Sequence, residues 1–223
     1  MIILIIDIMS IQFNGQIHQD KFILNMLNGK TNGFFLEIGS NDPIKINNTY
    51  VLEKHFGWNG IMVEYEPKYL QLYKTHRPNS IHIINDATNI NYKEVFELNN
   101  VPQNIDYLQI DLEVNNSSTI NTLKKLDSEI FDNYKFATVT FEHDIYLGNF
   151  FDTRFLSREI FKKRGYVCVF EDINDSNSPY EDWWVHPDLV NMNYVNQVIS
   201  NNNINYNEHP ITQKTINWKN IKY

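Results

Sequence analysis

Residues 33–42, with the sequence GFFLEIGSND, carry the strongest structural signal in the chain. The apolar run at 34–38, interrupted only by Glu37, is typical of a strand that is buried on both faces. Gly39 follows at once, and the polar residues after it predict a sharp turn. Ligands of open α/β sheets bind beyond the carboxyl ends of the strands, so Glu37 and Gly39 are candidates for ligand contact. An ordinary strand and turn would show the same local pattern, so the fold has to be inferred from the remaining segments of the chain as well.

Short apolar segments alternate with segments of helical periodicity along the chain. Strands are predicted at 34–38, 61–63, 80–84, 105–111, 135–141 and 166–170, and a further one at 183–185. Helices are predicted at 21–27, 48–56, 67–76, 93–98, 119–126 and 153–163, with one or two more between 187 and 198. The alternation predicts βαβ units, and therefore an α/β fold with a Rossmann-like, doubly wound and mainly parallel sheet.

The size and composition fit one domain. Of the 223 residues, 42% are hydrophobic and 14% aromatic, which is enough to bury a substantial core. We expect residues 1–200 to form a single domain with an N-terminal helical lead-in, and the Asn-rich residues 201–223 to form a tail. The single cysteine, Cys168, excludes an intrachain disulfide and lies in an apolar run typical of a core.

Charge and the N-terminal residues limit the partners. The formal net charge of −8 disfavours nucleic acid, because phosphate contacts need a basic surface. The apolar residues 1–6 are too few to span a bilayer and lack a basic preamble, so we expect a cytoplasmic protein and no membrane partner. Paired tryptophans such as Trp183 and Trp184 fill cores and subunit interfaces, which leaves a homo-oligomer open. We expect one of the two in the core and the other against a substrate or partner.

Four successive predicted strands end at or just before a carboxylate, namely Glu37, Glu64, Asp86 and Asp111. Because strand ends converge in a doubly wound sheet, these carboxylates are expected at one crevice. Such a cluster is costly unless a cation or a hydrogen-bond donor occupies it. S-adenosylmethionine (SAM) offers a positive centre, ribose hydroxyls and an exocyclic amine. Each carboxylate could instead cap the helix that follows its strand.

A carboxylate cluster that binds SAM would suit a methyltransferase, and two other functions stay open. An NAD(P)-dependent Rossmann oxidoreductase is expected to show G-x-G-x-x-G after its first strand, and this chain has only Gly39 there. A non-catalytic Rossmann-like protein that binds SAM or a protein partner would share the same strand ends. Binding of SAM would distinguish a methyltransferase from the oxidoreductase. Transfer of the methyl group would distinguish a methyltransferase from the non-catalytic binding protein.

Several motifs resemble those of FkbM-type SAM-dependent methyltransferases. They are FLEIGSN at 35–41, GWNGIMVE at 57–64 and DYLQIDLE at 106–113, with QD at 19–20 and FEH at 141–143. The resemblance spans about residues 10–186 and implies the class I SAM-dependent methyltransferase fold. It also implies methyl transfer to a hydroxyl of a sugar, glycan or similar small molecule. The chain departs from the family at Val114, where a glycine is usual, and in its glycine-poor first loop.

The same resemblance implies site residues. By position in the motifs, the cofactor would be bound by Glu37, Gly39, Ser40, Asn41, Glu64, Asp86, Ala87 and Asp111. In that set Glu64 would hold the ribose, Asp86 and Ala87 the adenine, and Asp111 would lie beside the methyl group. The catalytic candidates are Asp111, Glu113 and His143, with Asp111 or His143 as the base. No metal is called for, although Asp111, Glu113 and His143 could together hold a divalent ion.

Overall fold

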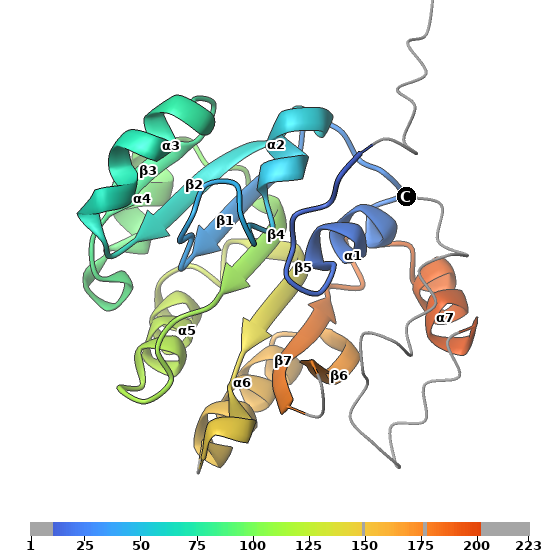
Figure 1. Ribbon diagram of the computed structural model, residues 1–223. Helices are drawn as coiled ribbons and strands as arrows, with labels where there is room; N and C mark the ends of the chain where they lie inside the picture. Colours follow the sequence, from blue (N-terminus) through green and yellow to red (C-terminus); the bar gives the residue numbers. More distant parts are fainter. Residues whose placement is uncertain (1–10, 149, 176–177, 202–223) are drawn as a thin grey trace, which may run out of the picture.

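The computed structural model describes residues 11–148, 150–175 and 178–201 (Figure 1). Its centre is a seven-stranded sheet in the order β3-β2-β1-β4-β5-β7-β6. The strands are β1 (Phe34–Ile38), β2 (Asn59–Glu64), β3 (Ile81–Ile84), β4 (Asn104–Ile110), β5 (Lys135–Glu142), β6 (Val167–Asp175) and β7 (Ser178–Val185). The first five are parallel, and β7 is antiparallel to both of its neighbours. The predicted doubly wound, mainly parallel sheet is therefore confirmed.

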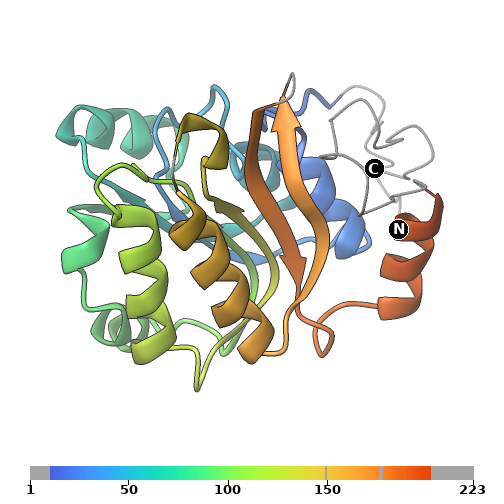
Figure 2. The ribbon, with the colours of Figure 1, turned by 90° about the horizontal axis from the view of Figure 1, so that it is seen from below.

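Helices cover both faces of the sheet, so the molecule has three layers (Figures 1 and 2). One face packs against α1 (Gln19–Met26), α2 (Tyr50–Phe56), α3 (Leu70–His76) and α7 (Met192–Asn201). The other packs against α4 (Tyr92–Leu98), α5 (Ser118–Glu129) and α6 (Phe151–Lys163). Short 3-10 turns complete the set: η2 (Pro67–Tyr69), η3 (Ala87–Asn89) and η4 (Ile145–Leu147). No helix in this part of the chain has the length and apolar character needed to cross a membrane.

Alternation along each strand sorts the side chains between the two layers. In β1, Phe35 belongs to the core beneath α1 and α2, whereas Leu36 and Ile38 belong to the core beneath α5. Both cores are fully buried, which explains why β1 is almost continuously apolar. The same alternation determines on which face of the sheet each polar side chain at a strand end lies.

The C-terminal part of the sheet differs from the predicted βαβ rhythm. Instead of a sixth parallel unit and a short isolated strand, β6 and β7 form an antiparallel pair, with β7 inserted between β5 and β6. Trp183 and Trp184 both have 0% exposure, one in each core, so the expected substrate or partner contact of one tryptophan is wrong. Adjacent residues of a strand face opposite sides, and here both sides are covered. Residues 1–6 and the predicted tail beyond Asn201 lie outside the described residues.

Candidate active site

A cavity of about 400 Å³ opens beyond the carboxyl ends of β2, β3 and β4. Its volume falls in the range of roughly 300–1,000 Å³ that is usual for small-molecule sites. The lining comes from three strand ends: Val63, Glu64 and Tyr65 after β2; Asn85, Asp86 and Ala87 after β3; Leu112, Glu113, Asn116 and Ser118 after β4. Four predicted site residues therefore line one cavity, namely Glu64, Asp86, Ala87 and Glu113.

Glu64 is fixed at the end of β2 by two backbone amides. Its Oε2 accepts a hydrogen bond from the Asn41 amide at 2.7 Å, and its Oε1 accepts one from the Glu66 amide at 2.9 Å. The side chain is 8% exposed and reaches the cavity. Each carboxylate oxygen has a second acceptor site, so Glu64 can still accept hydrogen bonds from hydroxyl groups of a ligand.

Asp86 has a local role in addition to lining the cavity. Its Oδ1 accepts from the Thr88 amide at 2.8 Å and from the Thr88 hydroxyl at 2.7 Å, which caps η3. The capping interpretation thus holds for this carboxylate. The cap fixes the chain so that Ala87 presents a small side chain to the cavity, and the Tyr92 hydroxyl donates to the Ala87 carbonyl at 3.0 Å.

Gly39 allows the ends of β1, β2 and β4 to converge. Its φ is +83°, and a Cβ at this position would lie 1.8 Å from the carbonyl oxygen of Asp111. The amides of Gly39 and Ser40 both donate to the Val63 carbonyl, at 3.0 and 3.1 Å. Gly39, Ser40 and Asn41 are thereby placed next to Glu64, although they do not belong to the described lining of the cavity.

Glu37 is used inside the protein. It is 0% exposed, and its carboxylate accepts from the Thr49 hydroxyl at 2.9 Å and from the Asn47 side-chain amide at 3.3 Å. The guanidinium of Arg77 lies 4.0 Å away and also binds Glu53 at 2.9 Å. Burial raises the pKa of Glu37, and Arg77 opposes that rise. Glu37 therefore belongs to a network that orders the loop between β1 and α2, and its contact with a cofactor stays a prediction.

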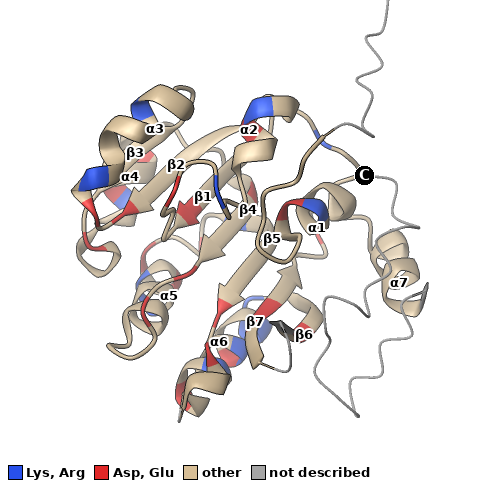
Figure 3. Ribbon diagram, viewed as in Figure 1, with Lys and Arg blue, Asp and Glu red and all other residues tan. Residues whose placement is uncertain are grey.

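Three carboxyl groups lie side by side across β4, β5 and β7, and we call them the carboxyl row: Asp111, Glu142 and Glu181. Ile110 pairs with Phe141, which sets Asp111 opposite Glu142, and Glu142 pairs with Glu181. Asp111 is exposed, Glu142 is half-buried and Glu181 is buried. Figure 3 shows acidic residues at these strand ends. The carboxyl row lies next to Glu113 and Glu64, which line the cavity.

Burial and the closeness of like charges favour the protonated forms of the carboxyl groups in the carboxyl row. The Asp111 and Glu142 side chains share a hydrogen bond, and partial burial together with the Asp111 charge raises the pKa of Glu142 well above its usual range. Burial raises the pKa of Glu181 to about 8, even though Trp183 Nε1 donates to it at 2.8 Å and Gln19 Nε2 at 3.1 Å. Sequence reasoning did not select Glu142 or Glu181. The alternation of side chains along β5 could have indicated Glu142, since Glu142 and Thr140 face the same side of the sheet. The position of Glu181 depends on how β7 pairs with β5, which the sequence pattern does not show.

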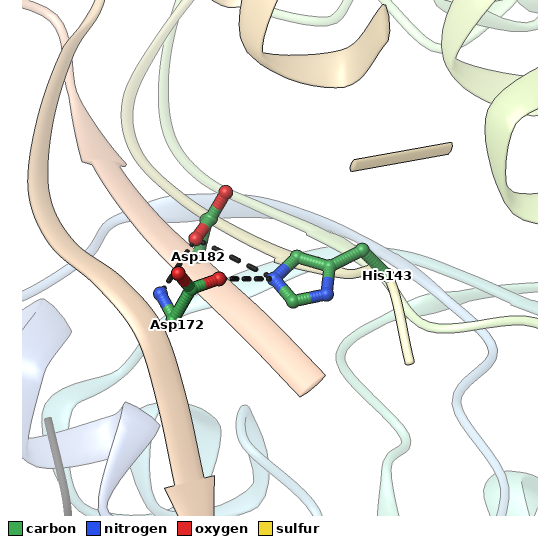
Figure 4. Close-up of side chains that lie close together, drawn as sticks. All are labelled: His143, Asp172 and Asp182. Carbon is green, nitrogen blue, oxygen red and sulfur yellow. Dashed lines mark hydrogen bonds and ion pairs between the residues drawn. The ribbon is translucent and has the colours of Figure 1, made fainter. Parts of the chain in front are cut away.

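His143 lies on the opposite face of the sheet from the carboxyl row. Its ring is 0% exposed, and its Nε2 lies 3.5 Å from Asp172 Oδ1 and 3.5 Å from Asp182 Oδ1 (Figure 4). Ile145 donates its amide to His143 Nδ1 at 3.4 Å. The structure therefore does not bring His143 together with Asp111 and Glu113. It places His143 among β5, β6 and β7, because the residue next to Glu142 must face the other way.

The expected metal-ligand set is not assembled either. In the described part of the chain, the group of three with ligand atoms within 4.8 Å of one another is His143, Asp172 and Asp182. Arg158 binds Asp182 through Nε at 2.7 Å and Nη2 at 2.8 Å, and Arg154 Nε binds Asp172 at 2.7 Å. The two carboxylates thus already have cationic partners. These residues form a buried ion-pair network that ties α6 to β6 and β7.

Comparisons with known proteins concern the fold. No protein-family model matches the chain, and no curated protein matches it significantly. A solved structure of a proposed rRNA methylase from Clostridium thermocellum is 14% identical, with a TM-score of 0.50 over 79% of this chain and 99% of that one. A TehB-like SAM-dependent methyltransferase from Corynebacterium glutamicum is 10% identical, with a TM-score of 0.48 over 75% of this chain and 86% of that one.

At these identities the similarity bears on architecture and not on activity. The match to the Clostridium thermocellum structure extends over nearly all of that chain. In this chain, antiparallel β7 lies between β5 and β6. The chain has the class I SAM-dependent methyltransferase fold.

Proposed function

We propose that this protein is a SAM-dependent methyltransferase of the FkbM type, acting on a hydroxyl of a sugar, glycan or similar small molecule. The observation that carries the proposal is the position of Glu64, at the carboxyl end of β2 and at the wall of the 400 Å³ cavity. An acidic residue at such a strand end binds ribose hydroxyls in nucleotide-binding sheets. Asp86 and Ala87 line the same cavity after β3 and would contact the base.

The proposed chemistry needs little from the protein beyond positioning and one base. SAM, when bound, supplies an electrophilic methyl group attached to a sulfonium. Asp111 is the proposed base: it is exposed at the strand ends, and Glu113 beside it lines the cavity. It would accept the hydroxyl proton as the acceptor oxygen gains the methyl group. His143 is a weaker candidate, because its ring is buried on the other face of the sheet.

The surroundings favour a small acceptor over RNA. Exposed aromatic side chains follow β5, with Tyr146, Phe151 and Phe155 between 48% and 62% exposed, and their flat apolar faces suit a sugar ring. The carboxyl row and the net charge of −8 would repel a phosphate backbone. A cytoplasmic location and a homo-oligomeric state belong to this proposal as predictions from the sequence.

Binding of SAM tests the cofactor. We expect isothermal titration calorimetry to detect SAM binding and Glu64→Gln to weaken it about 10- to 100-fold, because hydrogen bonds to a charged group contribute roughly 1.5–3 kcal/mol. Glu66→Gln is the matched control, since Glu66 is exposed and its only described ion pair, with Lys68, is 3.9 Å long. Wild-type affinity in Glu64→Gln, or no SAM binding at millimolar concentration, would overturn the cofactor assignment.

Methyl transfer tests the activity. With isotopically labelled SAM and a pool of saccharides, we expect label in the acceptor fraction. Asp111→Asn should lower kcat by about 10²- to 10⁴-fold, the usual contribution of a general base. Asp188→Asn, beyond the opposite ends of the parallel strands, should leave kcat unchanged. A chain that binds SAM tightly but labels no hydroxyl compound would instead be a SAM-binding protein without turnover.

A further inference from the structure

The carboxyl row lacks the cationic partners that other buried carboxylates of this protein have. Glu53 is bound by Arg77 at 2.9 Å, Asp106 by Lys30 at 2.6 Å and Asp182 by Arg158 at 2.7 Å. Within the described ranges, no Lys, Arg or His nitrogen lies within 4.0 Å of a carboxylate oxygen of the carboxyl row. Within the described part of the chain, only protons or neutral donors therefore offset its negative charge, and a cationic ligand could do so as well.

More acidic groups surround the carboxyl row. The titratable groups that face it are Glu64 and Glu113 toward Asp111, Asp144 toward Asp111 and Glu142, and the Tyr146 hydroxyl toward Glu142 and Asp144. His143 faces Asp144 from the neighbouring position. Glu181 contacts neutral donors, Gln19 and Trp183. The Tyr107 hydroxyl, which also faces Glu181, is neutral at ordinary pH because burial raises its pKa.

A buried acceptor without a donor lies close to the carboxyl row. Gln109 precedes Asp111 by two residues on the same face, and its Oε1 accepts from Asn48 Nδ2 at 2.8 Å. Asn48 is 6% exposed, and its Oδ1 has no hydrogen-bond partner in the described part of the protein. Gln109 Nε2 donates to the Gly39 carbonyl at 3.4 Å. The Asn48 Oδ1 lies against Gly15, and it can accept a hydrogen bond from an N–H or positively charged group.

We propose that the carboxyl row distinguishes SAM from its product by charge, releasing a proton when SAM binds and retaining it when S-adenosylhomocysteine binds. The proposal rests on the proposed function, since it requires these two ligands to bind. They share the adenosine, ammonium and carboxylate groups and differ by one methyl group and one positive charge on sulfur. An opposite charge within about 4–6 Å lowers the pKa of a carboxyl group by about 1 to 3 pH units.

Near pH 7.5 the carboxyl row is suited to this exchange. The pKa of Glu181 is raised to about 8, so its protonated form predominates slightly before any cation arrives. Sulfonium binding would shift Glu181, directly or through Asp111 and Glu142, toward the charged form. A ligand with neutral sulfur would leave the proton in place. S-adenosylhomocysteine could then dissociate without breaking an ion pair between its sulfur and the carboxyl row, because its sulfur is neutral.

Calorimetry in two buffers measures the proton directly. Titrations of the wild-type protein with SAM and with S-adenosylhomocysteine at pH 7.5, in phosphate and in Tris, give the number of protons released from the change in heat with buffer ionisation enthalpy. We expect SAM to release about 0.5 to 0.75 proton more than S-adenosylhomocysteine, because a group with a pKa of about 8 is roughly three-quarters protonated at pH 7.5. Glu181→Gln should abolish most of that difference, because Glu181 carries the exchangeable proton. Asp188→Asn should preserve it, because Asp188 is exposed and bound to Lys135 at 2.6 Å.

The outcomes separate this inference from the function on which it rests. Equal proton counts for the two ligands in the wild-type protein would overturn the inference and leave the methyltransferase standing. A difference that persists in Glu181→Gln would likewise overturn it, since the proton would come from elsewhere. If neither ligand bound, the proposed function would fall and the inference with it.

Discussion

Gly39 and Gly165 have almost the same backbone conformation, with φ of +83° and +84°, but different surroundings. Nothing lies within 4 Å of a Cβ built on Gly165, whereas a Cβ on Gly39 would meet the Asp111 carbonyl oxygen at 1.8 Å. A left-handed backbone alone costs an L-residue about 1–2 kcal/mol. We expect Gly165→Ala to lose that much free energy of unfolding, and Gly39→Ala clearly more because β1 and β4 must separate. Urea denaturation of both variants makes the comparison, and equal losses would contradict it.

Side-chain chemistry alone does not determine which residue at the end of β5 faces the carboxyl row. Glu142 and His143 are adjacent, so only one of them can face the carboxyl ends on the α1 side of the sheet. Imidazole chemistry favoured His143, but the register with β4 and β7 puts Glu142 in the carboxyl row. The positions of Glu64, Asp86 and Ala87 could be predicted, because each directly follows a strand whose end lies at the cavity. The internal use of Glu37 could not, since Arg77 arrives from the end of a distant helix.

At the scale of elements, the ion-pair network between α6 and the β6–β7 pair is the least replaceable contact. Asp182 is fully buried; burial opposes its ionisation, but the bonds from Arg158 and His143 hold its pKa well below its usual range. We expect Arg158→Met to lower the free energy of unfolding by about 3–5 kcal/mol at pH 7, because it leaves a buried carboxylate unpaired. Urea denaturation measures the loss.

Lys135→Met provides the control for Arg158→Met. It removes the ion pair of Lys135 with Asp188, whose side chains are 47% and 62% exposed, and should change stability by at most about 1 kcal/mol. The pKa of Asp182 is lower in the folded chain than its unfolded value of 3.8, so ionised Asp182 stabilises the fold above pH 3.8. This stabilisation is lost progressively as the pH falls below 3.8. The gap between Arg158→Met and wild type should therefore narrow below pH 3.8. A gap that is constant down to pH 2.5 would contradict this origin.

Local pattern located the elements well but did not reveal how the last two strands pair. The segments 34–38 and 135–141 were recognisable because each is a short apolar run with a turn on either side. The insertion of β7 between β5 and β6 depends on contacts such as Thr140 with Trp183 and Cys168 with Trp184, which join residues far apart in the sequence or across a hairpin. Periodicity carries no information on partners of this kind.

For the molecule as a whole, the uneven placement of charge matters more than its total. The chain has 27 acidic and 19 basic side chains. The described Arg residues at 77, 154, 158 and 164 all pair with carboxylates away from the cavity. No ion pair with a described Lys, Arg or His reaches the carboxyl row, at the carboxyl ends of β4 and β5 and beside Glu181 of β7. Convergence of the acidic strand ends followed from the predicted parallel sheet. Their lack of counter-charges could only be seen once the arginines were placed.

This imbalance predicts that stability falls with rising pH just above neutrality. The folded-state pKa of Glu181 is raised from 4.5 to about 8, so the folded chain keeps a proton that the unfolded chain has lost. The associated stability is complete below pH 4.5 and is lost as the pH rises through 8. Between pH 7 and 8.5, we expect wild type to lose about 1 kcal/mol of unfolding free energy relative to Glu181→Gln, which has no proton to lose.

The pH range of the measurement isolates this effect. The pKa values of His18 and His186 are lowered by burial, which gives stability the opposite slope, but the effect is small above pH 7 and is common to wild type and Glu181→Gln. Urea denaturation of wild type and Glu181→Gln at pH 7.0, 7.5, 8.0 and 8.5 gives the difference directly. A difference that stayed flat or grew in favour of wild type would show that Glu181 is charged in the folded protein. In that case the carboxyl row would have no proton to exchange for a bound cation.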